Sequence, residues 1–255
     1  MGFGIQKLKS IVGRFLGRGQ ILLENPPRPQ ITVAVIGDIH GRADLLEKLL
    51  GRLSKEWPDA KLVFVGDYVD RGPDSRKVLE LLQNSTIDAV CLAGNHEMML
   101  QEFLVDPVEY GGRWLRNGGR ETLASFGVLL DADPNVEQLG IAASEFGILL
   151  SDGTLDWLRA RPFSWQSGNL FVTHAGPDPS RPVSDQLNQN LVWGHQRFLR
   201  DDRTDGVWVV HGHWAGECAT CAAGRINVDT GAWRSGRLTA ALIEPNGSVR
   251  FVRQS

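Results

Sequence analysis

The chain has 255 residues, 42% hydrophobic and 22% charged, which is the composition of an ordinary globular protein. Its formal net charge of −3 argues against a general nucleic-acid-binding surface. No apolar run approaches the roughly 18–20 residues that span a bilayer, and three cysteines are too few for a disulfide framework. We therefore expect a cytoplasmic protein from a reducing compartment.

Residues 1–20 differ in composition from the rest, because apolar residues at helical spacing alternate with basic ones. The basic positions are Lys7, Lys9, Arg14 and Arg18. Two interpretations stay open: a basic amphipathic helix that contacts a membrane surface or partner, and a helix that lies on its own domain. The segment 24–30, ENPPRPQ, is typical of a short stiff linker. Residues 1–30 thus form an N-terminal segment that precedes the folded domain.

From residue 31 onward, predicted strands and helices alternate. The predicted strands cover 31–38, 60–67 and 87–95, and the predicted helices cover 42–57 and 74–85. The strands end roughly 28 residues apart, which is the length of a βαβ unit. This spacing predicts three neighbouring parallel strands whose carboxyl ends share one edge of a sheet, where ligands bind in such folds.

The remaining chain reads as a helical region followed by more strands. Residues 98–165 are mainly helical in pattern, with glycine-rich turns. Short apolar runs predict strands at 168–176, 205–216, 224–233 and 237–252. We expect these strands to form a second, more antiparallel sheet, so that residues 31–255 make one α/β domain.

Polar residues stand where the predicted strands end. Asp38 and His40 are two positions apart in GDIHG, so both side chains can reach one ion. Asp67 ends the next strand, and its two carboxylate oxygens can bridge two metals. Asn95 and the histidines of HAG and HGH can complete a second position. Carboxylate, amide and imidazole ligands without thiolate suit Mn, Fe or Zn.

Two metals about 4 Å apart can clamp a phosphoryl group during in-line displacement and activate a bridging water. Such a site needs a proton donor for the leaving alkoxide, and His96 next to Asn95 is the best placed candidate. Asp70 in GDYVDRG is placed to orient His96, and Arg71 to bind phosphate oxygens in a bidentate manner. These residues predict a phosphoester hydrolase.

The ordered motifs GDIHG, GDYVDRG, GNHE, HAG and HGHW resemble the phosphoprotein phosphatase family of metallophosphoesterases. The resemblance covers residues 31–243 and is strongest to bacterial Ser/Thr-phosphatase-like and bis(5′-nucleosyl)-tetraphosphatase members. It implies a calcineurin-like fold, a four-layer αββα sandwich with a di-metal site at strand ends. Residues 31–255 would then be a metallophosphoesterase domain.

The resemblance also implies residue roles. The ligands of one metal would be Asp38, His40 and Asp67, and those of the other Asp67, Asn95, His174 and His213. His213 is preferred over His211 because the family's ligand directly follows a small residue. Among the catalytic residues, His96 would be the general acid paired with Asp70, and Arg71 would bind phosphate. Two divalent ions are implied, with Mn favoured over Fe or Zn.

One position departs from the family pattern. Relatives often carry a second phosphate-binding arginine shortly after LLW, whereas this chain reads LVWGHQRFL with His195 in that place. An imidazole has neither the fixed fork nor the permanent charge of a guanidinium. Three readings stay open: Arg197 substitutes from a shifted register, substrate binding is weakened, or His195 serves a different substrate.

The favoured function is a Ser/Thr phosphoprotein phosphatase, in which a metal-bridging hydroxide attacks the phosphorus directly. GDYVDRG resembles the protein phosphatases, whereas GHW followed by Ala215 resembles the tetraphosphatases. A symmetrical dinucleoside tetraphosphate hydrolase is therefore the alternative, and a weakly active phosphate-binding scaffold is an alternative of another class. The expected partner is a phosphorylated protein or a small phosphate ester.

Cys218 and Cys221 form a single CxxC motif. A redox or zinc role and a pair of incidental loop thiols are both open, because a lone CxxC is weak evidence for either metal or redox chemistry. A regulatory effect on the nearby His213 is also open.

Overall fold

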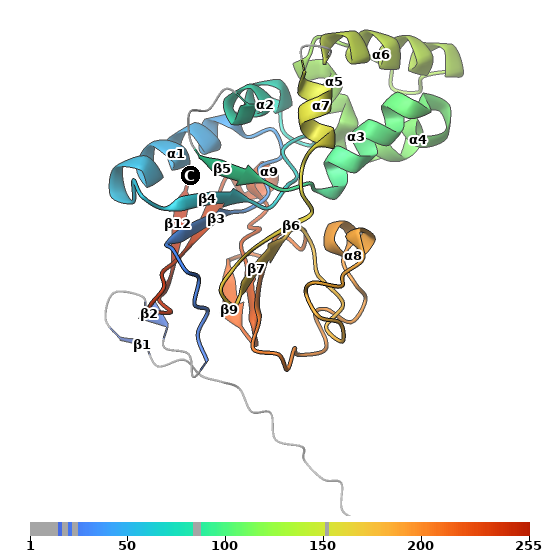
Figure 1. Cartoon of the computed structure of the whole chain (residues 1–255). Coiled ribbons are helices and arrows are strands. Elements are labelled where there is room, and N and C mark those ends of the chain that lie inside the picture. The colour runs from blue at the N-terminus through green and yellow to red at the C-terminus, as the bar shows by residue number, and fades with distance from the viewer. Residues whose placement is uncertain (1–14, 17–19, 22–24, 84–87, 151–152) are drawn as a thin grey trace, which may run out of the picture.

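The computed structural model describes residues 15–16, 20–21, 25–83, 88–150 and 153–255 (Figure 1). Most of the helix expected over residues 1–20 lies outside this part of the chain. Where the segment is described, β1 (Phe15–Leu16) pairs with β2 (Gln20–Ile21) as antiparallel strands rather than as helix. The linker packs on the domain, because Pro27 and Pro29 are buried.

The first large sheet carries the three parallel strands that the sequence predicts. Its order is β12 (Val249–Gln254), β11 (Leu238–Ile243), β3 (Val33–Ile36), β4 (Lys61–Phe64) and β5 (Ala89–Cys91). β3, β4 and β5 are parallel, whereas β11 and β12 are antiparallel additions. The expectation that residues 237–252 belong to the second sheet is wrong. β3 is buried on both faces, and β11 satisfies the backbone groups on its second edge.

The second large sheet packs face to face against the first. Its order is β6 (Ser164–Ser167), β7 (Leu170–Thr173), β8 (Trp208–His211), β10 (Arg225–Asn227) and β9 (Thr220–Ala222). Within the described chain, both sheets contain two parallel and two antiparallel pairings. The second sheet is therefore no more antiparallel than the first, contrary to expectation, because β7, β8 and β10 run parallel.

Alternating side chains show how the layers stack. Val33 and Val35 of β3 pack with Val172 of β7 and Val210 of β8, so this core lies between the sheets. The intervening residues of β3 join the core under the helices. On the second sheet, Phe171 and Val209 instead pack with Leu191 of α8. The period of two along each strand thus produces the expected four layers of helix, sheet, sheet and helix.

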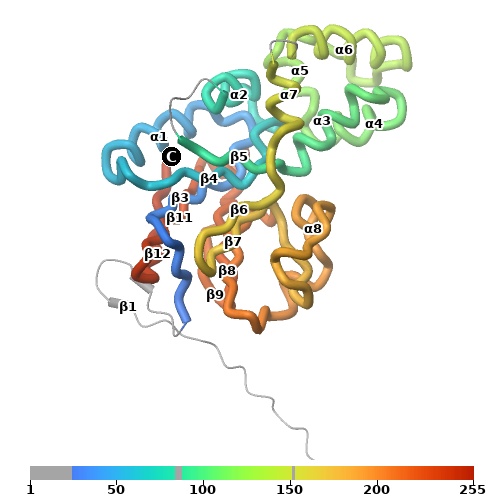
Figure 2. The backbone as a smooth tube through the Cα atoms, in the orientation of Figure 1, coloured from blue at the N-terminus to red at the C-terminus, as the bar shows by residue number. Residues whose placement is uncertain are grey.

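Some helices flank the sheets, and others form a separate group (Figure 2). The helices on the first sheet are α1 (Ala43–Glu56) and α2 (Ser75–Gln83), while α8 (Asn188–Trp193) lies by the second sheet and α9 (Ala232–Ser235) precedes β11. The group between β5 and β6, here called the helical cap, comprises α3 (Asn95–Val105), α4 (Pro107–Trp114), the π-helical turn η1 (Leu115–Gly119), α5 (Arg120–Ser125), α6 (Val136–Leu149) and α7 (Thr154–Arg159). Among the described residues, no helix has the length and apolar character needed to cross a membrane.

Candidate di-metal active site

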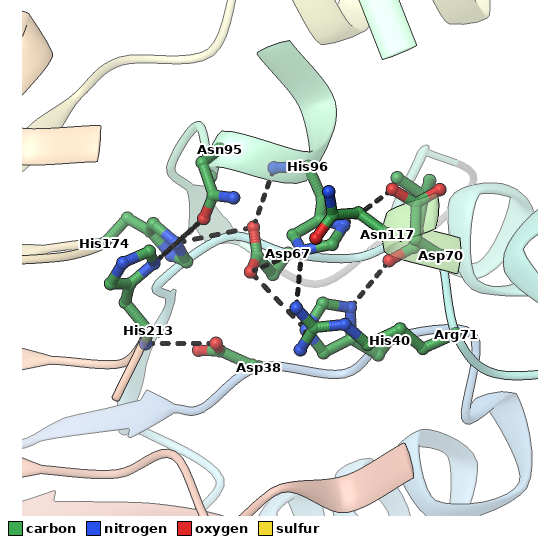
Figure 3. Close-up of polar contacts among 12 residues, drawn as sticks. Asp38, His40, Asp67, Asp70, Arg71, Asn95, His96, Asn117, His174 and His213 are labelled. Carbon is green, nitrogen blue, oxygen red and sulfur yellow. Dashed lines mark hydrogen bonds and ion pairs between the residues drawn. The ribbon is translucent and has the colours of Figure 1, made fainter. Parts of the chain in front are cut away.

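The ends of five strands deliver the predicted ligands to one place (Figure 3). Asp38 follows β3, Asp67 follows β4, and Asn95 opens α3 after β5. His174 directly follows β7, and His213 follows β8. Asp67 lies between a group formed by Asn95, His174 and His213 and a group that contains His40 and His96. The structure therefore brings the six predicted ligands together at the carboxyl edges of both sheets.

The backbone at this centre is unusual. Six described non-glycine residues have positive φ, and five of them belong to the predicted site. These five are His40 (46°), Asp67 (54°), Asp70 (72°), Arg71 (68°) and His213 (66°). Such left-handed conformations are costly for residues with a Cβ, and they persist only where the surroundings impose them. The fold thus stabilises strained backbone conformations that direct these side chains into the predicted site.

The group on one side of Asp67 has the character of a cation site. His174 Nε2 and His213 Nδ1 each lie 2.9 Å from Asn95 Oδ1, and His174 Nε2 lies 3.4 Å from Asp67 Oδ1. Burial lowers the pKa of His174, and it lowers the pKa of His213 to about 4. Both imidazoles are therefore neutral and have a lone pair available for a metal.

The group on the other side is built around His40. Its Nδ1 lies 2.8 Å from the Val69 carbonyl and acts as donor there, which leaves the Nε2 lone pair facing Asp67 Oδ2 at 3.5 Å. Burial lowers the pKa of His40 to about 3. His96 Nε2 also approaches Asp67 Oδ2, at 3.9 Å. The histidines around Asp67 lower its pKa, although burial alone would raise it.

Asp38 supplies the clearest evidence that the donors fit metal ions. Its Oδ2 accepts a hydrogen bond from His213 N at 3.0 Å, whereas its buried Oδ1 has no hydrogen-bond partner among the described residues. Burial and the nearby carboxylates of Asp229 and Asp67 raise the pKa of Asp38. An orphaned buried carboxylate oxygen beside neutral imidazoles and a shared carboxylate is a donor set that suits divalent cations.

His96 belongs to a buried hydrogen-bond network. Its Nδ1 lies 2.6 Å from Asp70 Oδ2, and its backbone N–H donates to Asp67 Oδ1. Asp70 also accepts from Trp114 Nε1 at 3.0 Å and from Thr122 Oγ1 at 2.7 Å. Burial acts to lower the pKa of His96, but the charges of Asp67 and Asp70 raise it above the ordinary value. The network fixes the ring with Nε2 directed toward the metal centre.

Arg71 contacts both histidines on the His40 side of Asp67. Its two Nη atoms lie 3.1 Å from His40 Nε2 and 3.0 Å from His96 Nε2. Its backbone N–H donates to the carbonyl of Gly118, whose φ of 105° interrupts η1. A Cβ at Gly118 would lie 2.3 Å from Arg71 N, so the glycine permits the close approach that positions this arginine.

The other predicted residues contact groups outside the predicted ligand set. His195 Nε2 faces Asp178 Oδ2 at 3.8 Å, and Arg197 Nε donates to Asp201 Oδ2 at 2.6 Å. The structure does not turn Arg197 toward the centre. His211 is buried against Phe198, with ring centroids 5.0 Å apart, and burial lowers its pKa to about 4. His213, rather than His211, thus faces the other ligands.

The two cysteines of the CxxC motif differ in environment. Cys218 is exposed, whereas Cys221 is partly buried in β9. Burial raises the pKa of Cys221 to about 12, which disfavours the thiolate needed for redox or metal chemistry. In the part of the chain that the structure describes, the groups able to hold a metal contain no cysteine.

Sequence reasoning missed several residues that build the centre. Glu97 accepts hydrogen bonds from the backbone of Asp67, Tyr68 and Gly94, and burial raises its pKa to about 7. The sequence did point to Glu97, because it is the last residue of the GNHE motif. Asp229 was missed because it stands alone in the sequence far from Asp38. Trp114 was missed because an apolar residue gives no polar signal.

Comparison with known proteins agrees with this geometry. Residues 31–217 match the model of the calcineurin-like phosphoesterase family. Serine/threonine-protein phosphatase 2 of Escherichia coli (strain K12) is 42% identical over 217 residues, covering 80% of this chain and 89% of that protein.

Two further similarities concern proteins named for nucleotide substrates. The symmetrical bis(5′-nucleosyl)-tetraphosphatase of Dechloromonas aromatica (strain RCB) is 33% identical over 149 residues, which cover 58% of this chain but only 45% of that protein. The crystal structure of a proposed diadenosine tetraphosphatase superposes with a TM-score of 0.61 at 23% identity, covering 90% of this chain and 96% of the other. With its site and fold in agreement, this chain belongs to the calcineurin-like phosphoesterases and is a metal-dependent phosphoester hydrolase.

Proposed function

We propose that the chain is a Ser/Thr phosphoprotein phosphatase that uses two divalent ions, preferably Mn²⁺. The ions would be held by Asp38, His40, Asp67, Asn95, His174 and His213. We also take residues 31–255 as the catalytic domain, because β11 and β12 complete the sheet that carries Asp38 and Asp67. The observation that carries the substrate proposal is the buried pair of His96 and Asp70, with 2.6 Å between its polar atoms.

When bound, the two ions supply Lewis-acid chemistry that activates water and offsets charge on the phosphoryl oxygens. Arg71 would bind the phosphate oxygens with its planar fork of N–H donors. His96 Nε2 would give a proton to the leaving oxygen, while Asp70 holds the opposite nitrogen and stabilises the protonated ring. Trp114 and Thr122 keep the Asp70 carboxylate in place through their hydrogen bonds.

The need for this proton depends on the leaving group. A seryl or threonyl alkoxide is a strong base, so its departure requires protonation in the transition state. A nucleotide phosphate or an aryl oxide is a weak base and leaves readily without a proton. A general acid held by a buried carboxylate therefore favours alkyl phosphomonoesters, such as phosphoserine and phosphothreonine, over polyphosphate anhydrides. The similarity to the Escherichia coli protein phosphatase supports the same substrate class.

Dinucleoside polyphosphates are the second candidate substrate. Trp214 and Ala215 follow the ligand His213, as in the tetraphosphatase-like GHWA motif, and the Dechloromonas relative carries the tetraphosphatase name. A preference of the purified protein for diadenosine tetraphosphate over every phosphopeptide would favour this candidate.

The test compares wild type with His96→Asn on a phosphoserine peptide and on 4-nitrophenyl phosphate. Loss of the general acid should lower kcat on the peptide by roughly 10²–10⁴-fold. The kcat on the aryl phosphate should fall much less, because its leaving group needs no proton. Metal content, measured by atomic emission, should stay unchanged in His96→Asn. Equal losses on both substrates, or loss of metal, would contradict the proposed role of His96.

A further inference from the structure

One exposed aromatic residue borders the reaction centre. Trp233 lies in α9 and is 39% exposed, an unusual state for a tryptophan. The guanidinium of Arg71 lies over its ring, with Cζ 5.5 Å from the ring centroid. The same guanidinium lies 3.0 Å from His96 Nε2. A single side chain therefore separates Trp233 from the proposed proton donor.

The turn that carries Trp233 is rigid. Asp229 accepts a hydrogen bond from Gly231 N at 2.8 Å, and Arg42 Nη1 donates to the Ala232 carbonyl at 2.9 Å. Ser235 Oγ donates to the carbonyl of Thr230 at 2.7 Å. Ala232 itself is buried, so the segment is anchored on both sides of the tryptophan. The backbone that carries the indole is thus fixed and needs little ordering when a substrate binds.

Arg71 is already held without Trp233. Its backbone is fixed by Gly118, and its guanidinium contacts His40 and His96. A role that only steadies the arginine therefore leaves the exposure of the indole unexplained. If His96 protonates the leaving oxygen, that oxygen lies near His96 Nε2, and Arg71 and Trp233 border this side of the site, so the group attached to the oxygen can reach the indole.

We infer that Trp233 forms a leaving-group subsite, where the indole stacks against a planar group that the substrate carries next to its scissile phosphate. The inference rests on the proposed role of His96 as proton donor. For a phosphoprotein substrate, the planar group is an aromatic side chain that flanks the phosphoserine. A nucleobase offers the same flat surface, so both sources of this chemistry are tested. Flat aromatic surfaces pack together in offset or edge-to-face geometry with a gain beyond simple burial.

The test uses two phosphoserine peptides that differ only in having Phe or Ala on both sides of the phosphoserine. Wild type should favour the Phe peptide in kcat/KM by about 3- to 10-fold, the range expected for an aromatic pair. Trp233→Leu should lower this ratio to about 1, whereas Trp233→Phe should keep most of it. Trp57→Leu is the matched control, because Trp57 lies between α1 and the amino end of β4, opposite the strand ends that carry the site, and it should keep the wild-type ratio.

Each other outcome has a defined meaning. A wild type without preference, or an unchanged preference in Trp233→Leu, would overturn the inference. Equal loss of kcat/KM on both peptides would also overturn it, because Trp233 would then act only through Arg71. Melting temperature and Mn²⁺ content show whether Trp233→Leu is misfolded. If it is, Trp233→Phe tests the inference instead: the inference stands if this variant keeps the preference for the Phe peptide and fails if it does not.

A nucleotide arm separates the inference from the proposed function. If neither peptide is hydrolysed although 4-nitrophenyl phosphate is, the phosphoprotein proposal fails. Wild type and Trp233→Leu are then compared on diadenosine tetraphosphate and on tripolyphosphate, which lacks a base. A preference for the nucleotide that Trp233→Leu loses would support a subsite for a nucleobase. A preference that is absent or unchanged would overturn the subsite itself.

Discussion

At the scale of single residues, the centre depends on side chains held in costly conformations. Positive φ at Asp67 and His213 turns each ligand sharply after its strand. Neighbouring glycines make room for these turns: a Cβ at Gly94 would lie 2.2 Å from Asp67 Oδ1, and one at Gly212 would lie 1.9 Å from Asp38 Oδ1. The glycines beside the ligands are therefore required by close contacts with the carboxylates and not only by flexible turns.

Gly94→Ala should displace Asp67, because the new methyl group would also meet the Asp67 backbone nitrogen at 2.4 Å. We expect affinity for Mn²⁺ to fall about 10- to 100-fold, as it does when groups that orient ligands are lost. Isothermal titration would measure this change. The control is Gly140→Ala in α6, where nothing lies within 4 Å of the new Cβ. It should leave metal binding intact and raise the free energy of unfolding by about 0.5–1 kcal/mol. Unchanged affinity in Gly94→Ala would contradict the close-contact argument.

At the scale of elements, α4 of the helical cap reaches the centre through Trp114, its last residue. The indole is fully buried, lies tilted against Phe103 with ring centroids 4.6 Å apart, and donates its N–H to both oxygens of Asp70. Thr122 of α5 donates to the same carboxylate. α4 and α5 therefore help to fix the orientation of the proposed proton donor through Asp70.

Trp114→Phe tests this connection, because it keeps an aromatic ring and removes the N–H donor. Losing a buried hydrogen bond to a carboxylate should cost about 1–3 kcal/mol of unfolding free energy. We expect kcat on a phosphoserine peptide to fall roughly 10-fold with unchanged Mn²⁺ affinity, since the ligands are untouched. Trp165→Phe in β6 is the matched control and should keep kcat. A wild-type kcat in Trp114→Phe would show that α4 does not tune the donor.

The elements also show what sequence could predict. The strands ending before Asp38, Asp67 and Asn95 were predictable, because each is a short apolar run closed by a polar residue. The pairing of β11 with β3 was not predictable. Both strands are fully buried, and a uniformly apolar pattern does not indicate which strand lies next to which. The link from Trp114 to Asp70 joins residues 44 positions apart, and only the folded chain reveals it.

At the scale of the whole molecule, two sheets converge on one candidate metal centre. The first sheet supplies Asp38 and Asp67, and the second supplies His174 and His213. Motif order in the sequence predicted this convergence through family resemblance, and the family match agrees with it. The sequence did not show that Arg197 pairs with Asp201. Two residues four positions apart form such an ion pair only where the chain between them turns, and the sequence did not predict a turn there. We therefore expect substrate choice to depend more on Arg71 and its surroundings than on Arg197.

The most direct test of a two-metal centre shared through Asp67 is a paired measurement of metal content and turnover. Metal-stripped wild type and Asp67→Asn are dialysed against Mn²⁺, and phosphate release from 4-nitrophenyl phosphate is followed in the same samples. Wild type should bind two ions per chain and turn over, whereas Asp67→Asn should lose at least one ion and its activity. Fewer than two ions in an active wild type, or full metal content and activity in Asp67→Asn, would contradict the account.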